Sequence, residues 1–147
     1  MSDPDHPFWK AVHGEVPLPP AAELLGWKVL EAEPDSGRIR VQFEATRDFT
    51  NPLGNIQGGF IGAMLDETLG PALATTFALT EFAPTLELKL NFLRPARPGV
   101  FVGDGRVVHR GRTVAFLEGT LSDAAGVIVA TASATARIIE LEPGELD

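Results

Sequence analysis

Asp66 is the residue whose type and setting point most directly to chemistry. It lies in the middle of an otherwise apolar segment, FIGAMLDETLGPALATTFAL. An ionised carboxylate is costly to bury unless it is paired or hydrogen-bonded. Adjacent helical positions lie about 100° apart, so one of Asp66 and Glu67 can be exposed while the other faces a cleft. The alternative is that both carboxylates lie on one solvated edge, and the pattern alone does not decide between the two.

Two glycines, Gly58 and Gly59, stand where this segment would begin as a helix. Free N–H groups at a helix N-terminus can polarise a carbonyl or hold an oxyanion, although an ordinary loop-to-helix junction uses the same residues. Asp66 lies eight residues after Gly58. That is about 12 Å along a helix, too far for both to touch one reacting atom within a single subunit. In a dimer with antiparallel helices, Asp66 of one subunit would face Gly58 of its partner, which predicts a shared site.

No other residue pattern points as clearly to catalysis. His6 is expected in a mobile N-terminal segment, His13 in an irregular one and His109 at the end of a strand. Metal-binding histidine spacing, a nucleophile elbow, a phosphate-binding loop and a dinucleotide-binding motif are all absent from the sequence. The sequence contains no cysteine, which excludes disulfides, thiolate nucleophiles and cysteine-ligated metals.

The charge is acidic overall but unevenly distributed. The net charge of −8 argues against nucleic acid as a general partner. Residues 140–147 form an acidic tail, with four acids and no base. Residues 94–112 instead carry five arginines against one acid, Asp104: Arg94, Arg97, Arg106, Arg110 and Arg112. Such a strip suggests a bound anion at one place, although solvated turn charges would give the same pattern.

Length and composition indicate one folded domain. The chain has 147 residues, of which 44% are hydrophobic and 22% charged, which is not the composition of a disordered chain. No run reaches the roughly 18 uncharged apolar residues of a membrane helix, so no membrane partner is expected. The N-terminus lacks the basic-then-apolar pattern of a signal peptide, so a cytoplasmic enzyme or binding domain is the default expectation.

The elements that must position these residues are six strands and one long helix. Alternating apolar residues predict strands over 27–33, 38–45, 85–93, 100–110, 113–123 and 127–139. A helix is predicted over 58–77, apolar enough to be buried all round, with an irregularity at Pro71. Residues 1–25 are expected to be irregular apart from short helical turns in HPFWKAV and PPAAELLG, and residues 48–59 form a loop. The connections RPARPG, RGR and DAAG have hairpin length, so the fold class is α+β, with one helix wrapped by a largely antiparallel sheet.

Over roughly residues 35–139 the chain resembles the hotdog-fold acyl-CoA thioesterases of the PaaI-like group. The family pattern is Asn, Gly, His-Gly-Gly and then an acid, and this sequence has Asn51, Gly54, Gln57-Gly58-Gly59 and Asp66 at that spacing. The segments TLELKLNFLRPARPG, VVHRGRT and VIVATASATARII extend the match. The resemblance implies that residues 1–147 form a single hotdog domain. It also implies a homodimer with two sites across the helix interface, often paired into a tetramer.

The resemblance also implies a role for each matching residue. Asp66 matches the catalytic carboxylate, acting as nucleophile or as base for water, and the Gly58 N–H matches the group that polarises the thioester carbonyl. Asn51 matches a residue that places the carbonyl or the water, and Thr85 a hydroxyl near that water. Contacts with the acyl-CoA are implied at Gly59, Asn91, Phe92, Leu93, Arg94, Arg110, Gly111, Arg112 and Thr113. CoA enters as part of the substrate, and the resemblance implies neither a metal nor a separate cofactor.

Gln57 is the one departure from the family pattern, because the family has His there. Gln is a neutral donor and acceptor, whereas His can carry charge and exchange a proton. If the position only orients the carbonyl, Gln57 can serve. If it must supply charge, the rate falls and the site binds more than it hydrolyses.

Two other functions stay open, and a third, a structural module, is disfavoured. A non-catalytic acyl-CoA binding protein would keep the arginines and lack turnover. A hotdog hydratase or dehydratase generally needs an Asp and His pair, and no His lies near the central helix in sequence. A structural module would not explain Asp66. The sequence decides neither the acyl group, aromatic or medium-chain, nor dimer against tetramer.

Overall fold

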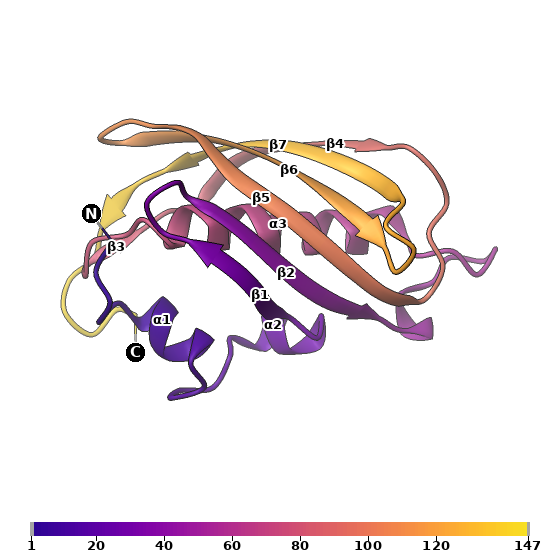
Figure 1. Cartoon of the computed structure of the whole chain (residues 1–147), viewed down its shortest axis with the longest axis horizontal. Coiled ribbons are helices and arrows are strands. Elements are labelled where there is room, and N and C mark those ends of the chain that lie inside the picture. The colour runs from indigo at the N-terminus through magenta and orange to yellow at the C-terminus, as the bar shows by residue number, and fades with distance from the viewer. Residues whose placement is uncertain (1, 147) are drawn as a thin grey trace.

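A six-stranded antiparallel sheet wraps around one long helix (Figure 1). The computed structural model describes residues 2–146. The helix is α3, Gly58–Ala74, and the strand order across the sheet is β1-β2-β5-β6-β7-β4. The strands span β1 Lys28–Glu33, β2 Arg38–Ala45, β4 Thr85–Phe92, β5 Gly99–Arg110, β6 Val114–Asp123 and β7 Ile128–Arg137. The predicted α+β architecture is therefore confirmed.

The sheet can wrap closely because glycines face the helix. A Cβ atom on Gly103 of β5 would lie 2.1 Å from Thr68 Oγ1, and one on Gly119 of β6 would lie 2.9 Å from Leu69 Cδ2. Larger residues at these positions would push α3 away from the sheet. Elsewhere the predicted alternation holds, and Ile39, Val41 and Phe43 of β2 are all buried against the helix side.

Pro71 lies inside α3 without ending it. A proline has no N–H, so the carbonyl four residues earlier, that of Glu67, loses its helical donor. The indole N–H of Trp27 supplies a replacement and donates to the Glu67 carbonyl oxygen over 2.9 Å. The helix ends at Ala74, three residues before the predicted end, where the hydroxyls of Thr75 and Thr76 donate to the Ala72 and Leu73 carbonyls.

The prediction that α3 is buried all round is wrong for the single chain. Gly59 and Asp66 are exposed, and Ala63, Glu67 and Gly70 are only half-buried. These five residues recur at helical spacing, so they form one face, which we call the open face of α3. The sheet covers the opposite side of the helix, where Met64, Leu65, Leu69 and Leu73 are fully buried.

The connection RPARPG is not a hairpin, which corrects the prediction. Strand β4 pairs with β7 at the edge of the sheet, whereas β5 lies between β2 and β6. The chain therefore runs around one end of the sheet between β4 and β5, at the right in Figure 1. Ala96 is buried there, and its carbonyl accepts the Ile56 N–H over 2.7 Å. The connections RGR and DAAG do form hairpins, β5–β6 and β6–β7.

The N-terminal segment is ordered by helices and by a buried histidine. The two predicted helical turns are α1, Pro7–Val12, and α2, Pro20–Leu24. His6 is 3% exposed, so the prediction that it is mobile is wrong. Its Nε2 donates to the Glu81 carbonyl over 2.9 Å and its Nδ1 accepts the Phe8 N–H, while its ring packs on Phe77.

Three short elements complete the fold. A 3-10 helix, η1, spans Arg47–Phe49 within the predicted loop region. Strands β3, Glu81–Phe82, and β8, Ile139–Glu140, form a separate two-stranded sheet that the sequence did not predict. Among the described residues, no helix is both long and apolar enough to cross a membrane.

Candidate active site

Asp66 and Thr85 meet on the open face of α3. The Thr85 hydroxyl donates to Asp66 Oδ1 over 2.9 Å, joining the middle of the helix to the first residue of β4. Both residues are exposed in the single chain. The hydrogen bond orients the carboxylate and leaves Asp66 Oδ2 without a partner among residues 2–146. A carboxylate so placed can accept a proton from water or attack a carbonyl carbon.

Glu67 differs from its neighbour because it turns partly toward the protein. It is half-buried, and burial together with the adjacent charge of Asp66 raises the pKa of its carboxyl group. Its backbone carbonyl is the one held by Trp27. Of the two arrangements that the sequence left open, the structure shows different environments for the adjacent acids, with Asp66 exposed and Glu67 half-buried.

Replacing Glu67 by glutamine is expected to stabilise the fold, and more so at high pH. A pKa raised above the ordinary value of 4.5 means that ionised Glu67 destabilises the folded state. The gain is therefore absent near pH 4, grows as pH rises from the unfolded-state pKa to the folded-state pKa, and is constant above it. Thermal unfolding of wild type and Glu67→Gln at pH 4 and pH 8 tests this, with a gain in Tm expected at pH 8 only. An equal gain at both pH values would contradict it.

The N-terminus of α3 is open. Gln57 occupies the N-cap position, is exposed and makes no capping hydrogen bond through its side chain. The backbone N–H groups of Gly58 and Gly59 have no acceptor among the described residues. The ring of Phe92 covers one side, since a Cβ on Gly58 would lie 3.1 Å from Phe92 Cζ, while Gly59 faces open space. The site therefore offers the free N–H donors of Gly58 and Gly59 beside the ring of Phe92.

Asn51 shapes the loop that leads into the helix. Its Oδ1 accepts the backbone N–H groups of Leu53, over 2.9 Å, and Asn55, over 3.2 Å. The side-chain carbonyl is thus used within the loop. Only the Nδ2 group of Asn51 is left to contact a ligand. The role implied for Asn51 therefore stays a prediction, and in that role the residue would donate a hydrogen bond to the carbonyl or the water.

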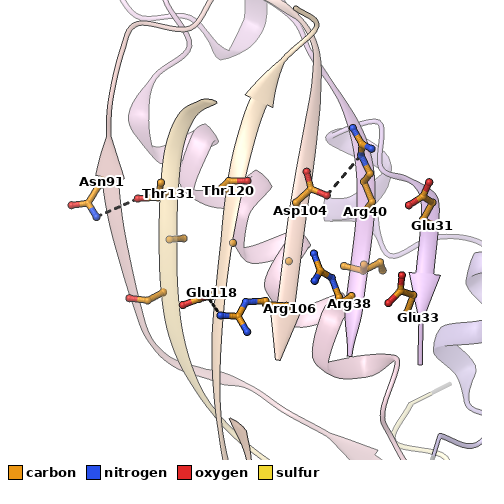
Figure 2. A pocket seen from close by; sticks show the side chains of 15 residues that line it. Glu31, Glu33, Arg38, Arg40, Asn91, Asp104, Arg106, Glu118, Thr120 and Thr131 are labelled. Atoms are coloured by element: carbon orange, nitrogen blue, oxygen red, sulfur yellow. Dashed lines mark hydrogen bonds and ion pairs between the residues drawn. The ribbon is translucent and has the colours of Figure 1, made fainter. Parts of the chain in front are cut away.

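The residues at the end of β4 divide between the two faces of the sheet. Phe92 lies on the helix side, against Gly58. Asn91 lies on the outer face, where its amide donates to Thr131 Oγ1 over 3.3 Å (Figure 2). Leu93 follows, 52% exposed, and Arg94 donates to the Ile128 carbonyl over 2.9 Å. The structure thus brings Phe92 to the helix N-terminus and takes Asn91 away from it.

The other cluster implied to contact CoA lies at the opposite end of the molecule. Residues 110–113 form the β5–β6 hairpin, at the left in Figure 1. There the guanidinium of Arg110 donates to the carbonyl and hydroxyl oxygens of Thr76, just past the C-terminus of α3, and forms an ion pair with Glu81. The 17 residues of α3 are about 25 Å long. Within one chain, the two clusters therefore cannot contact the same part of a ligand.

Arg110 is largely occupied by this internal pairing. Burial alone would raise the pKa of Glu81, but the hydrogen bonds from Arg110 and the Ala78 N–H, with the Arg110 charge, lower it below its ordinary value. Gly111 N–H donates to the Val114 carbonyl over 2.8 Å and closes the turn. Arg112 and Thr113 are exposed. Phosphate binding at this hairpin stays a prediction that now depends chiefly on Arg112 and Thr113.

A broad hollow lies on the outer face of the sheet, away from α3 (Figure 2). Charged side chains from neighbouring strands pair across it, including Arg40 with Asp104 over 3.7 Å and Arg106 with Glu118. Of the implied site residues, only Asn91 reaches it. Because four of its charged residues pair with one another and it lies on the face away from Asp66 and Gly58, we do not place the reaction there. Among residues 2–146, no group of three or more His, Asp or Glu side chains is arranged to hold a metal ion.

An antiparallel sheet wrapped around one helix, with a carboxylate on the open face of that helix and glycines at its start, defines a protein of the hotdog class. The chain belongs to the thioesterase superfamily, whose family model matches residues 53–130 and so includes Gly58, Asp66 and Thr85. Within that superfamily its structural neighbours are PaaI-related thioesterases.

Three relatives illustrate the similarity. The chain is 36% identical over 111 residues to a candidate esterase of Saccharolobus solfataricus, covering 75% of this chain and 76% of the relative. It is 38% identical to a candidate thioesterase of Ralstonia eutropha JMP134 described as related to phenylacetic acid degradation, with a TM-score of 0.85 and coverage of 88% and 98%. The Escherichia coli PaaI protein shares the fold, with a TM-score of 0.78, 19% identity and coverage of 90% and 93%.

Two features of the site escaped the sequence analysis. The Trp27 contact with Glu67 joins residues 40 positions apart, and its only sequence signal is that Pro71 leaves one carbonyl without a donor. The pairing of Arg110 with Glu81 was missed because β3, which carries Glu81, is only two residues long.

Proposed function

We propose that this protein is an acyl-CoA thioesterase that uses Asp66 as its catalytic carboxylate. The observation that carries the proposal is the Asp66–Thr85 hydrogen bond on the open face of a helix whose glycine N-terminus has free N–H donors. Thioesters are the substrates that membership of the superfamily implies. CoA enters as part of the substrate, and we propose no metal or separate cofactor.

The proposed reaction joins a water oxygen to the thioester carbonyl carbon and breaks the carbon–sulfur bond. The Gly58 N–H stabilises the negative charge that develops on the carbonyl oxygen. Asp66 takes the proton of the attacking water, or attacks the carbon itself to form an anhydride that water then hydrolyses. The leaving CoA thiolate is protonated, which yields free acid and CoA thiol. Thr85 orients Asp66, and Phe92 offers an apolar surface to an aromatic or medium-chain acyl group.

The site is proposed to form between two subunits. Asp66 and Gly58 are separated along one helix, so one reacting atom can touch both only if a second, antiparallel helix lies against the first. The open face suits such an approach because a Cβ at Gly59 or Gly70 would meet no atom within 4 Å. Edge strand β4 adds exposed apolar side chains, with Leu86 61% and Phe92 55% exposed. This arrangement also brings the partner's β5–β6 hairpin toward the Gly58 end of the first subunit.

Mixing two inactive variants is expected to restore activity if the site is shared. One variant, Asp66→Asn, keeps Gly58, and the other, Gly58→Pro, keeps Asp66. In a mixed dimer, one of the two sites then combines both intact residues. After unfolding and refolding an equimolar mixture, about a quarter of the wild-type thioesterase activity per site is expected.

Mixing two preparations of the same variant is the control and should restore nothing. A mixture that stays as inactive as its parts, although mixed dimers are shown by mass spectrometry, would show that each site uses Asp66 and Gly58 of the same subunit and is not shared.

A non-catalytic acyl-CoA binding protein is the second candidate. The observation that favours it is Gln57, which replaces the family's His at the exposed N-cap of α3. Such a protein would bind CoA esters without releasing the thiol. The Gln57→His variant would then gain thioester turnover.

A further inference from the structure

A second, smaller hollow lies beside the loop that leads into α3. Its lining residues are Arg47, Thr50, Asn51, Pro52, Gly54, Arg97 and Pro98. Arg47 and Arg97 come from different segments, the 3-10 helix η1 and the connection between β4 and β5. None of the family's implied contacts except Asn51 lies here.

Neither arginine has an anionic partner within the described part of the chain. The carboxylates of residues 2–146 come no closer than 4.0 Å to either guanidinium, and neither guanidinium makes a hydrogen bond. Arg110 at the other end of the molecule, by contrast, is bound to Glu81 and Thr76. Two unpaired guanidinium groups facing one hollow favour an anion between them, against the acidic charge of the chain as a whole.

The backbone around the hollow is held in place. Thr50 and Ile56 form a β-bridge, and the Ile56 N–H donates to Ala96, which ties the two arginine-bearing segments together. Gly54 has a φ of +77°, and Arg97 Nη1 lies 3.6 Å from where its Cβ would be, so the guanidinium rests against the loop backbone. Asn51 Oδ1 accepts hydrogen bonds from the Leu53 and Asn55 N–H groups, which fixes the loop wall of the hollow.

We propose that Arg47 and Arg97 form a phosphate subsite for the nucleotide part of CoA, which makes the enzyme select CoA thioesters over thioesters that lack phosphates. The inference rests on the proposed function, because it deepens the same site. Guanidinium groups bind phosphate through two parallel hydrogen bonds, which suits an anion held between two arginines. The same loop continues to the helix start, since the Gln57 N–H donates to the Phe49 carbonyl over 2.8 Å. Because the pantetheine arm separates the phosphates of CoA from its thioester, a ligand anchored in the hollow can extend along this loop to bring its carbonyl to the helix start.

Titration calorimetry with free CoA, dephospho-CoA and pantetheine tests the subsite without requiring turnover. Arg47→Ala and Arg97→Ala are each expected to weaken CoA binding about tenfold, and the double variant about 100-fold, while pantetheine binding is unchanged. Equal weakening for CoA and dephospho-CoA assigns the diphosphate to the hollow, and weakening for CoA alone assigns the 3′-phosphate. Arg137→Ala, an exposed arginine outside the hollow, is the matched control.

Kinetics separate this subsite from the proposed function. In the double variant, KM is expected to rise for an acyl-CoA with kcat unchanged, and neither should change for the corresponding acyl-N-acetylcysteamine thioester. Wild-type CoA affinity in the double variant, or loss of affinity in Arg112→Ala instead, would overturn the subsite even if turnover is found. If CoA binding depends on Arg47 and Arg97 but no thioester is hydrolysed, the subsite stands and the proposed function fails.

Discussion

Replacing Asp66 by asparagine is expected to reduce thioester turnover by a factor of about 100 to 10,000, because asparagine can neither accept a proton from water nor attack a carbonyl. Asparagine matches the carboxylate in size and can still accept the Thr85 hydrogen bond. Since Asp66 is exposed in the single chain, the fold should be unaffected. Initial rates of thiol release, with circular dichroism and thermal unfolding as folding checks, measure the effect.

Two neighbouring variants serve as controls for Asp66. Glu67→Gln changes the adjacent acid, which turns partly into the protein, and should keep kcat within a few-fold of wild type. Thr85→Val removes the hydrogen bond to Asp66 and keeps the carboxylate, so we expect a loss of only about tenfold. Turnover that survives in Asp66→Asn and disappears in Glu67→Gln would assign the catalytic role to the other acid.

Gly58→Pro is the second variant expected to have a large effect, a loss of about 100- to 1,000-fold in kcat. Gly58 is the first residue of α3, a position that proline favours because its missing N–H has no helical acceptor. Gln57 already has φ −62° and ψ 140°, which a following proline permits. The substitution therefore removes the proposed oxyanion donor while preserving the start of the helix.

Gly58→Ala is the matched control because it adds the same Cβ and keeps the N–H. Its Cβ would lie 3.1 Å from Phe92 Cζ, so the ring must shift by a few tenths of an ångström. The difference in kcat between the alanine and proline variants isolates the donor from this steric effect. Equal rates for the two would show that the Gly58 N–H takes no part in the reaction.

Periodicity predicted the elements well because each buries one face. Strand β2 begins and ends where its alternation of Ile39, Val41 and Phe43 predicts. The length and apolar character of the central segment likewise gave α3 its correct start at Gly58. The open face of α3 was not predicted. Apolar residues in the sequence indicate that a helix face is covered, but they do not show whether the sheet of the same chain or a second chain covers it.

The sequence did not predict the pairings between distant strands, because such pairings depend on contacts that local periodicity does not record. The length of a connection does not determine which strands pair. The segment RPARPG was therefore wrongly predicted to join two paired strands, whereas β4 pairs with β7 at the edge of the sheet. Alternation did contain one unused signal, since Asn91 and Phe92 are adjacent in a strand and must face opposite sides. The contact of Arg110 with Glu81 depends on a two-residue strand that no periodicity marks.

The most direct test of the central claim is thiol release from a panel of acyl-CoA thioesters, measured with a thiol-reactive dye. The panel includes phenylacetyl, hydroxybenzoyl, short-chain and long-chain esters, and the absence of cysteine from the protein removes its own background. We expect that the wild type hydrolyses at least one ester and that Asp66→Asn loses this turnover. No release from any ester, by a protein that still binds CoA, would contradict it and identify a binding protein instead.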